Sequence, residues 1–368
     1  MYYTYLKKYA KRPWNIKVDE GYTPNLTVMV PTYNEAALIV ERLENIKSQE
    51  YPRENLEIMV IDSASTDKTL DIARSWSIEN LDINARILEE PLRRGKISAI
   101  NYALKRISED TEIIVFTDAD CMWMPDALRN AVKYFYDLSI GAVTCCIYPF
   151  KSSKGSFESV YRNHNNVVRV AESKIWGTPI FHGPLAAFRC HLLRKIGGIP
   201  TWVWADDSGP ATLLAFMGYR CIAAPDVVAY EDVPRRFRNN LGRRARRAIH
   251  LIHLFLRMEK EVNTKDLKPS KTFKHIYLLE KTLHLVNPWI LAFATIILLT
   301  DFIINPFNSI YTALTLTVAV GCIIASKAYR TWLLTQLILT YAFIKNIFGK
   351  DLLMWEPVKE IRIGRHQA

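Results

Sequence analysis

Two aspartates separated by one residue, Asp118 and Asp120, directly follow the apolar run Ile113–Phe116. In a turning chain, carboxylates two residues apart can converge on one hard cation, and that cation can bridge the oxygens of a diphosphate. The same two side chains could also be solvated turn residues. The motif alone therefore leaves a metal site and a plain turn both open.

A second acidic pair, Asp206 and Asp207, precedes a predicted helix from Ser208 to Met217. One aspartate could cap this helix while the other reaches into a cleft. Adjacent carboxylates raise each other's pKa, which suits one of them to accept a proton near neutral pH. Helix cap and general base are both open interpretations of this pair.

Other polar side chains follow predicted strands. Asp62 ends one strand and could accept hydrogen bonds from a ribose or a base, whereas Thr66 and Asp67 are typical caps of the next helix. Lys96 precedes a helix, where a cation next to a helix N-terminus suits an anionic ligand. Each of these signals is weak when it is taken alone.

Short apolar runs alternate with helical spacing over the first 230 or so residues and must position these side chains. The runs predicted as strands are Leu26–Val30, Leu56–Ile61, Ala85–Leu88, Ile113–Phe116 and Ala142–Cys146. Helices are predicted at Glu35–Ser48, Asp67–Trp76, Ile97–Ile107 and Asp126–Tyr136. The alternation predicts an α/β fold with a mostly parallel sheet, in which ligands bind beyond the carboxyl ends of the strands.

The chain has 48 basic and 37 acidic residues, a net charge of +11, and residues 235–247 hold seven arginines without an acid. Such a run could bind nucleic acid, anionic lipid headgroups or a phosphorylated ligand. Its place ahead of the apolar region favours a membrane surface or a phosphate, and no nucleic-acid-binding motif is present. The six cysteines lack metal-ligand spacing and are interpreted as reduced thiols.

From Leu285 to Phe348 only four side chains are charged. Two stretches, Leu285–Ile304 and Phe307–Ser326, are each long enough to cross a bilayer, and Trp332–Phe348 could cross, re-enter or lie in the interface. A buried helical hairpin is the alternative. The first residues contain no apolar signal segment, so we expect the N-terminal part on the cytoplasmic side, in agreement with Lys327 and Arg330 after the second stretch.

Six motifs, in order, resemble those of family 2 glycosyltransferases, inverting enzymes of the GT-A fold, over about residues 26 to 250. They are PTYNEA at 31–36, DSASTD at 62–67, RRGKISAINYAL at 93–104, DAD at 118–120, HGPLAAFR at 182–189 and ADD at 205–207. The resemblance extends to polysaccharide synthases and to dolichyl- or polyprenyl-phosphate sugar transferases. It implies a Rossmann-like, mostly parallel sheet with flanking helices, followed by C-terminal transmembrane helices.

The resemblance also implies roles for individual residues. The nucleotide base and ribose would be held by Pro31, Tyr33, Glu35 and Asp62, and the ribose and diphosphate by Lys96 and Asp118. Asp118 and Asp120 would bind Mg²⁺ or Mn²⁺. Asp207, with Asp206 beside it, would be the base that deprotonates the acceptor hydroxyl. On the acceptor side the resemblance places His182, Gly183 and Pro184, and Trp204 could stack on a sugar or simply pack in the core.

The chain departs from the family at a motif, QxxRW, that many membrane-embedded synthases carry. Arg246 matches the motif's arginine, while Arg243 and Arg247 replace its glutamine and its tryptophan. Because that tryptophan lies beneath the acceptor sugar in processive relatives, its loss puts processive synthesis in doubt. The added arginines could instead hold the phosphate of the donor or of a lipid-linked acceptor.

We therefore expect a basic segment at 1–24, a GT-A domain at 25–258, a linker or interfacial helix at 259–284, a membrane domain of two or three helices at 285–348 and a cytosolic tail at 349–368.

The expected enzyme sits in the plasma membrane or its equivalent. It would move one sugar from a nucleotide sugar to a lipid-linked or membrane-proximal glycan acceptor, in contact with membrane lipids and without nucleic acid. A processive synthase of the cellulose or hyaluronan synthase type and a non-catalytic sugar-nucleotide binding module are the alternatives. The sequence assigns no sugar, base or oligomeric state.

Overall fold

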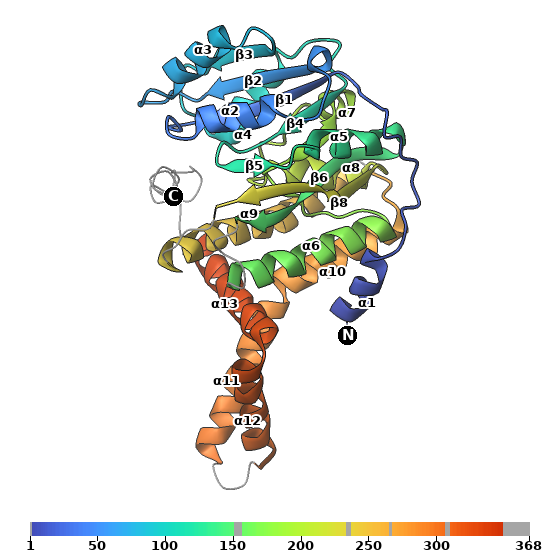
Figure 1. Cartoon of the computed structure of the whole chain (residues 1–368). Coiled ribbons are helices and arrows are strands. Elements are labelled where there is room, and N and C mark those ends of the chain that lie inside the picture. The colour runs from blue at the N-terminus through green and yellow to red at the C-terminus, as the bar shows by residue number, and fades with distance from the viewer. Residues whose placement is uncertain (1, 151–156, 233–236, 265–266, 306–309, 349–368) are drawn as a thin grey trace.

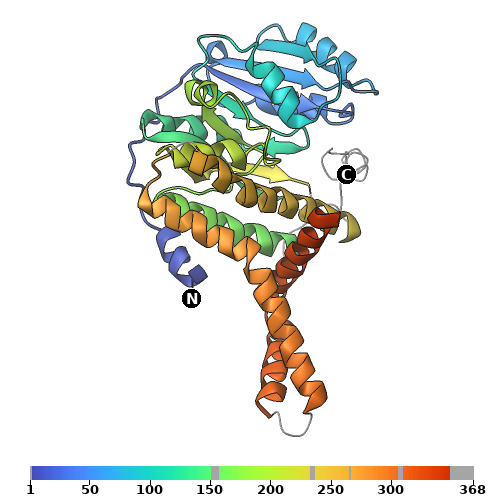
Figure 2. The same ribbon diagram turned by 180° about the vertical axis from the view of Figure 1, so that it is seen from behind.

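The fold comes from a computed structural model that describes residues 2–150, 157–232, 237–264, 267–305 and 310–348. A layered α/β body occupies one end, and a narrow pair of antiparallel helices projects from the other end (Figure 1). The view from behind shows the same division (Figure 2). The expected tail at 349–368 and Pro306, which was expected in the turn between the apolar stretches, lie outside the described residues.

An eight-stranded sheet runs through the body in the order β3-β2-β1-β4-β7-β6-β8-β5. The strands are β1 (Leu26–Thr32), β2 (Leu56–Asp62), β3 (Asn84–Glu89), β4 (Ile113–Phe116), β5 (Cys121–Trp123), β6 (Ile140–Pro149), β7 (Ala186–Arg189) and β8 (Arg220–Glu231). The neighbouring strands β3, β2, β1 and β4 pair in parallel, as do β6 and β8. β7 is antiparallel to both β4 and β6, and β5 is antiparallel to β8. All five predicted strands are confirmed. The sheet is mixed because of β5 and β7, which were not predicted.

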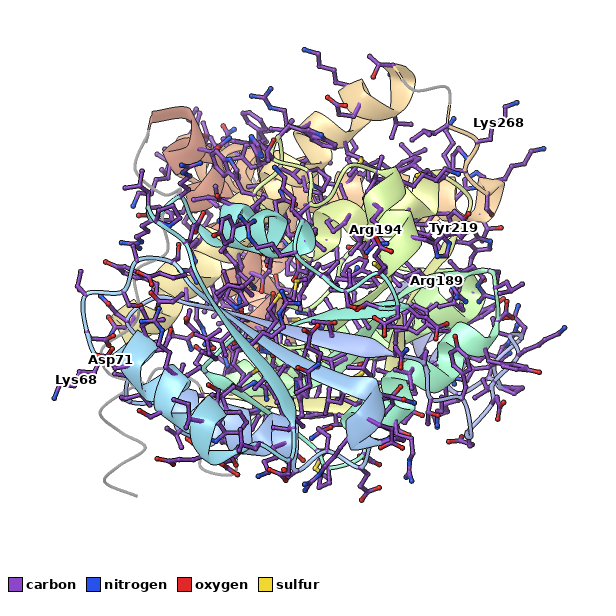
Figure 3. The ribbon with its side chains drawn as sticks, turned by 90° about the horizontal axis from the view of Figure 1, so that it is seen from above. Lys68, Asp71, Arg189, Arg194, Tyr219 and Lys268 are labelled. Atoms are coloured by element: carbon purple, nitrogen blue, oxygen red, sulfur yellow. The ribbon has the colours of Figure 1, made fainter. Side chains whose placement is uncertain are left out.

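Side chains of the sheet alternate between two cores. Along β1, Leu26, Val28 and Val30 join one apolar cluster while Met29 joins the cluster on the opposite face, as the two-residue period of a strand requires. Helices cover both faces: α2 (Ile39–Lys47), α3 (Thr69–Glu79), α4 (Lys96–Leu104), α5 (Ala127–Val132), α7 (Cys190–Lys195) and α8 (Ser208–Phe216), with 3₁₀ turns at Arg53–Asn55 and Lys133–Tyr136. Seen from above, Lys68 and Asp71 mark the start of α3 on one side of the body, and Lys268, ahead of α10, lies on the other side (Figure 3).

A layer of long helices lies between the sheet and the projecting pair (Figures 1 and 2). It contains α1 (Tyr2–Ala10), α6 (Phe157–Ile175), α9 (Phe237–Thr264) and α10 (Lys271–Leu285). α9 continues as one helix past residue 258, where the GT-A domain was expected to end. α10, expected as a linker or interfacial helix, packs on the body through Phe273 and Tyr277, and its buried Glu280 pairs with Arg169 of α6 at 2.8 Å.

The C-terminal helices are α11 (Asn287–Ile304), α12 (Ile310–Ala325) and α13 (Lys327–Phe348). Within α11 only Pro288 is buried, and within α12 only Thr312, so this apolar pair contacts little of the protein. By length and composition α11 could cross a membrane. α12 and α13 are bent by 108° at a short break between them, and they could supply a second crossing only if both count as one span. α13 instead packs against α9.

The contact between α9 and α10 predicts a clear stability effect. Phe255 of α9 is fully buried and its ring lies 5.5 Å from that of Tyr277. We expect Phe255→Ala to lower the free energy of unfolding by about 3–5 kcal/mol, because it removes buried ring surface and leaves a cavity. Its neighbour Leu256 is 50% exposed, so Leu256→Ala should cost less than about 0.5 kcal/mol. Equal losses for the two variants in thermal denaturation would contradict this packing.

Candidate active site

One cavity of about 1330 Å³ opens along the carboxyl ends of the parallel strands, the edge at which α/β folds bind ligands. Fifteen of the residues singled out in the sequence line it: Pro31, Tyr33, Glu35, Lys96, Asp118, Asp120, His182, Gly183, Pro184, Trp204, Asp206, Asp207, Arg243, Arg246 and Arg247. Asp62 does not line it. The carboxylate of Asp62 is buried and accepts the backbone N–H of Ser65 at 2.9 Å, so Asp62 shapes the loop after β2 while Ser63 faces the cavity.

Lys96, the first residue of α4, joins the two acidic motifs. Its ammonium lies 2.6 Å from Asp118 and 2.7 Å from Asp206. Burial disfavours the charge of Lys96, but the two carboxylates outweigh that effect and raise its pKa. Lys96 is therefore a fixed cation that holds residues from β4 and from the loop before α8 at one place.

Asp207 combines the two interpretations that the sequence left open. Its Oδ1 caps α8 by accepting the N–H of Ser208 and, at 2.9 Å, the Ser208 hydroxyl. Burial and then the neighbouring Asp206 raise the pKa of Asp207 to about 7, against the influence of Lys96. One aspartate of the pair, Asp207, caps the helix and the other, Asp206, lines the cavity, as the sequence allowed, but the cap Asp207 lines the cavity as well.

Gly183 leaves an opening between the two acidic motifs. A Cβ at this residue would lie 3.0 Å from Asp118 Oδ2 and 3.6 Å from Asp207 Oδ2. Any side chain here would therefore enter the space into which both carboxylates point. The arrangement can place a ligand between a carboxylate that titrates near neutral pH and a carboxylate of the Asp118–Asp120 motif.

Asp118 and Asp120 offer hard oxygen donors on the loop after β4. Burial, then Asp118 and Glu231, raise the pKa of Asp120 to about 6, while Arg243 and Arg247 oppose the rise. Among the described residues no group of three or more His, Cys, Asp or Glu side chains could hold a metal ion by itself. Two carboxylates beside an open space nevertheless suit Mg²⁺ or Mn²⁺, because such ions commonly take only one or two protein carboxylates and complete their shell with phosphate oxygens.

Three of the arginines whose side chains the structure describes in this run, Arg243, Arg244 and Arg247, are paired with carboxylates inside the protein. Glu231, the last residue of β8, accepts from Arg162 at 2.5 Å, from Arg243 at 3.1 Å and from Arg247. Burial opposes the charge of Glu231, but these guanidinium groups outweigh it and lower its pKa. Arg244 pairs in turn with the buried Glu158 at 3.0 Å. The membrane-surface interpretation of this run is therefore wrong for Arg243 and Arg244, which are buried in ion pairs, whereas the phosphate interpretation stays a prediction.

Arg246 differs from its neighbours on α9. Within the part of the chain that the structure describes, no ion pair or hydrogen bond is found for its guanidinium, although the side chain is only partly exposed. Burial and the nearby Arg247 and Arg243 lower the pKa of Arg246 to about 10, with Asp118 acting in the opposite direction. The cavity thus contains an uncompensated cation near the Asp118–Asp120 motif, a suitable place for an anion.

His182 and Trp204 line the cavity and also pack in the body. Nδ1 of His182 lies 2.8 Å from the carbonyl oxygen of Cys145, and burial lowers the pKa of His182 to about 3, so its ring is neutral. Trp204 stacks on His253 with ring centroids 4.0 Å apart and adjoins the apolar cluster of α9 and α13.

Sequence reasoning missed three carboxylates near the cavity. Glu231 and Glu158 pair with the arginines described above, and Glu90, just after β3, lines the cavity and is 3% exposed. The acidic pair Glu89-Glu90 at the end of a predicted strand was a usable signal for Glu90. Glu231 and Glu158 had none as residues of the site, because the fold brings each of them to arginines of another element: Glu231 to Arg162 on α6 and to α9, and Glu158 to Arg244 on α9 besides its own neighbour Arg162.

The family model described as "Glycosyl transferase family 2" matches residues 27–197, and that described as "Glycosyl transferase family group 2" matches residues 113–344. Among solved structures, a mannosyltransferase from Pyrobaculum calidifontis in complex with GDP-Man and Mn²⁺ is 44% identical, with a TM-score of 0.83, over 95% of this chain and 94% of that one.

Two curated relatives match shorter regions. A dolichyl N-acetyl-alpha-D-glucosaminyl phosphate 3-beta-D-2,3-diacetamido-2,3-dideoxy-beta-D-glucuronosyltransferase of Methanococcus voltae is 36% identical over 30% of this chain. A poly-beta-1,6-N-acetyl-D-glucosamine synthase of Staphylococcus aureus is 27% identical over 63% of it. The matches span only 33% and 56% of the lengths of those two proteins.

The second family model covers more than half of the chain, and the P. calidifontis enzyme aligns with nearly all of it. The fold agrees as well, since the mixed sheet and its flanking helices are those of a GT-A enzyme. The chain belongs to glycosyltransferase family 2 and is an enzyme that acts on nucleotide-sugar donors.

Proposed function

We propose that this enzyme transfers one sugar, with inversion, from a nucleoside-diphosphate sugar to the hydroxyl of a lipid-linked or membrane-proximal acceptor. The observation that carries the proposal is the meeting of Asp207 Oδ2 and Asp118 Oδ2 on either side of Gly183. One carboxylate is poised to accept a proton, and the other belongs to the motif suited to a donor diphosphate.

In the proposed reaction Asp207 accepts the proton of the acceptor hydroxyl. The oxygen of that hydroxyl attacks the anomeric carbon of the donor sugar while the bond from this carbon to the diphosphate breaks. The hydrogen bonds from Ser208 to Oδ1 fix the Asp207 carboxylate and leave Oδ2 toward the opening at Gly183. Arg246 and Lys96 lie where they can stabilise the charge that develops on the departing diphosphate. A divalent cation held by Asp118 and Asp120 would add Lewis-acid stabilisation of that diphosphate.

The P. calidifontis relative, which was solved with GDP-Man and Mn²⁺, supports a nucleoside-diphosphate donor and a divalent cation. The M. voltae relative, named for its dolichyl-phosphate-linked acceptor, supports a lipid-linked acceptor. Pro31, Tyr33 and Glu35 line the cavity from the end of β1 and the loop after it, which suits the nucleoside. His182 and Pro184, on either side of Gly183, and Trp204 line it as well and suit the acceptor.

The charge of the helix layer supports a membrane setting for this reaction. On α1, Lys7 and Lys8 are exposed, as are Lys271 and Lys274 on α10, whereas every acidic residue described on α1, α6 and α10 is buried. The helices that carry these lysines, α1 and α10, lie in the layer from which the apolar pair α11 and α12 projects (Figure 1). Apolar helices that enter a bilayer and lysines that meet anionic headgroups would act together there.

Single transfer is favoured over processive synthesis by the residue at the motif's tryptophan position. Arg247 replaces the aromatic platform and is bound to Glu231, so it offers no aromatic face for an acceptor sugar. The binding-module alternative is overturned by membership of an enzyme family.

Product size tests the proposed function directly. We expect the purified full chain in lipid, with Mn²⁺, a panel of radiolabelled nucleotide sugars and membrane lipid extract, to yield one discrete product that partitions into organic solvent. A high-molecular-weight ladder would instead favour the processive synthase. Hydrolysis of the donor without any transfer would show that the acceptor is not among the extracted lipids.

Replacement of the proposed base should abolish transfer and leave the fold intact. Asp207→Asn keeps an oxygen for the α8 cap but cannot accept the proton, so we expect turnover to fall about 10²- to 10⁴-fold. Donor affinity by calorimetry and the Tm should stay close to wild type. Turnover within a few-fold of wild type would remove Asp207 as the base.

The pH profile provides an independent readout of the same residue. Because the base must be ionised and burial raises its pKa to about 7, the acceptor kcat/KM should fall as the pH drops below about 7. Asp206→Asn removes a negative charge that contributes to this pKa, so the acidic limb should move to lower pH even if turnover also drops. An unmoved limb in this variant would argue against titration of Asp207.

Metal dependence should be lost with the Asp118–Asp120 motif. We expect Asp120→Ala to bind the donor with the same weak affinity in Mn²⁺ and in EDTA, while wild type binds more tightly in Mn²⁺, because one of two carboxylate ligands is gone. The surface variant Asp71→Ala on α3 is the matched control and should behave as wild type. Equal donor affinity of wild type with and without EDTA would refute the metal role.

A further inference from the structure

A buried carboxylate that the proposed reaction does not use stands at the nucleoside end of the cavity. Glu90 follows β3, its side chain lines the cavity, and it is 3% exposed. Its backbone N–H donates to the carbonyl oxygen of Asp62 at 2.8 Å, which places Glu90 beside the end of β2. No ion pair of Glu90 is found among the residues that the structure describes.

Two hydroxyl groups hold the Glu90 carboxylate from opposite sides. Ser63, after β2, donates to Oε2 at 2.7 Å, and Ser98, in the first turn of α4, donates to Oε1 at 2.7 Å. A carboxylate has about four acceptor sites on its two oxygens, so each oxygen can accept another hydrogen bond. The serines therefore orient a pair of acceptors beside the cavity.

The buried charge of Glu90 favours a ligand with hydrogen-bond donors. A carboxylate away from water is stable only where hydrogen-bond donors or cations compensate it. The donors found for the Glu90 side chain are the two serine hydroxyls, and the side chain also lines the cavity, where a ligand could supply further donors. A ligand that presents two parallel N–H groups would complete the set as a guanidinium does in a bidentate pair.

Among the common nucleotide bases, guanine presents such a pair, N1–H and the 2-amino group. Uracil presents one N–H between two carbonyl oxygens, which the carboxylate would repel, and adenine and cytosine place a ring acceptor next to their amino group. We propose that Glu90 recognises the base of the donor and selects guanine, so that the donor is a guanosine-diphosphate sugar. This inference rests on the proposed function only in that the cavity binds a nucleotide sugar.

The first turn of α4 links this subsite to the reaction centre. Ser98 contacts Glu90, and Lys96, two residues earlier, contacts Asp118. A nucleotide with its base at Glu90 would therefore have its diphosphate end near Lys96 and the Asp118–Asp120 motif. Base selection and diphosphate binding share one short helical segment.

Binding of free nucleotides to the full chain in detergent with Mn²⁺, followed by calorimetry, tests the proposal. We expect GDP to bind more tightly than UDP and ADP. IDP, which lacks only the 2-amino group, should bind about 10- to 100-fold more weakly than GDP, the usual loss for one hydrogen bond to a charged group. Equal affinities for GDP and IDP in wild type, or tightest binding of UDP, would overturn the proposal without reference to any variant.

Variants then assign the discrimination to Glu90. In Glu90→Gln an amide group replaces one acceptor, so GDP affinity should fall to about that of IDP while UDP affinity changes less than about threefold. Ser98→Ala removes one of the two hydroxyls that orient the Glu90 carboxylate, so the ratio of the GDP affinity to the IDP affinity should become smaller. Glu89→Gln is the matched control, because Glu89 is exposed and pairs with Arg74 on the surface.

The outcomes separate this inference from the proposed function. If Glu90→Gln has a normal Tm and an unchanged ratio of GDP affinity to IDP affinity, Glu90 does not recognise the base, although the cavity still binds nucleotides. Binding of all nucleotides with one affinity would lead to the same conclusion. Binding of no nucleotide to wild type would overturn both proposals together.

Discussion

The structure depends on the balance of charge around one cavity. Asp118, Asp120, Asp206, Asp207 and Glu231 line it, and like charges in a partly buried space repel one another. Lys96 joins the first and second acidic motifs, and the guanidinium groups of Arg162, Arg243 and Arg247 neutralise Glu231. Burial and the neighbouring carboxylates act most strongly on Asp120 and Asp207, whose pKa values rise to about 6 and about 7. These are the positions at which a cation and a proton would have to arrive.

α9 connects this balance to the rest of the molecule. Its arginines reach the cavity, and within the same turns Ala245, Ala248, Ile249 and Ile252 pack against Ile338, Leu339 and Ala342 of α13. Small and branched side chains at this spacing let the two helices approach closely. A displacement of α13 would therefore be transmitted to Arg243, Arg246 and Arg247. Since removal of one partner from a buried ion pair costs about 3–5 kcal/mol, α9 has little freedom to move independently of β8.

Local patterns predicted much of the fold and many of the charged residues that line the site. Apolar runs found the five strands, and the order of short motifs located fifteen residues around one cavity. The errors share a physical cause. In the sequence, residues 235–247 form a basic run without any acidic partner. The carboxylates that pair with Arg243 and Arg244 come from other elements, Glu231 from β8 and Glu158 from α6. β7 is a four-residue strand whose antiparallel pairing with β4 depends on long-range register. Asp62 was expected to accept hydrogen bonds from a ribose or a base, and no local pattern shows that its carboxylate accepts the N–H of Ser65 instead.

The replacement of an aromatic residue by Arg247 follows from the same electrostatics. Glu231 closes β8 beside Asp120, and without cations it would add a further negative charge to the place where Asp120 must stay available. Arg243 and Arg247, one helical turn apart on α9, bind the same Glu231 oxygen, and Arg162 binds the other. An aromatic ring at residue 247 could not supply that charge. In this chain the position therefore serves the balance around the Asp118–Asp120 motif, and the aromatic ring of Trp204, which lines the cavity and adjoins the cluster of α9 and α13, lies elsewhere on α9's side of the site.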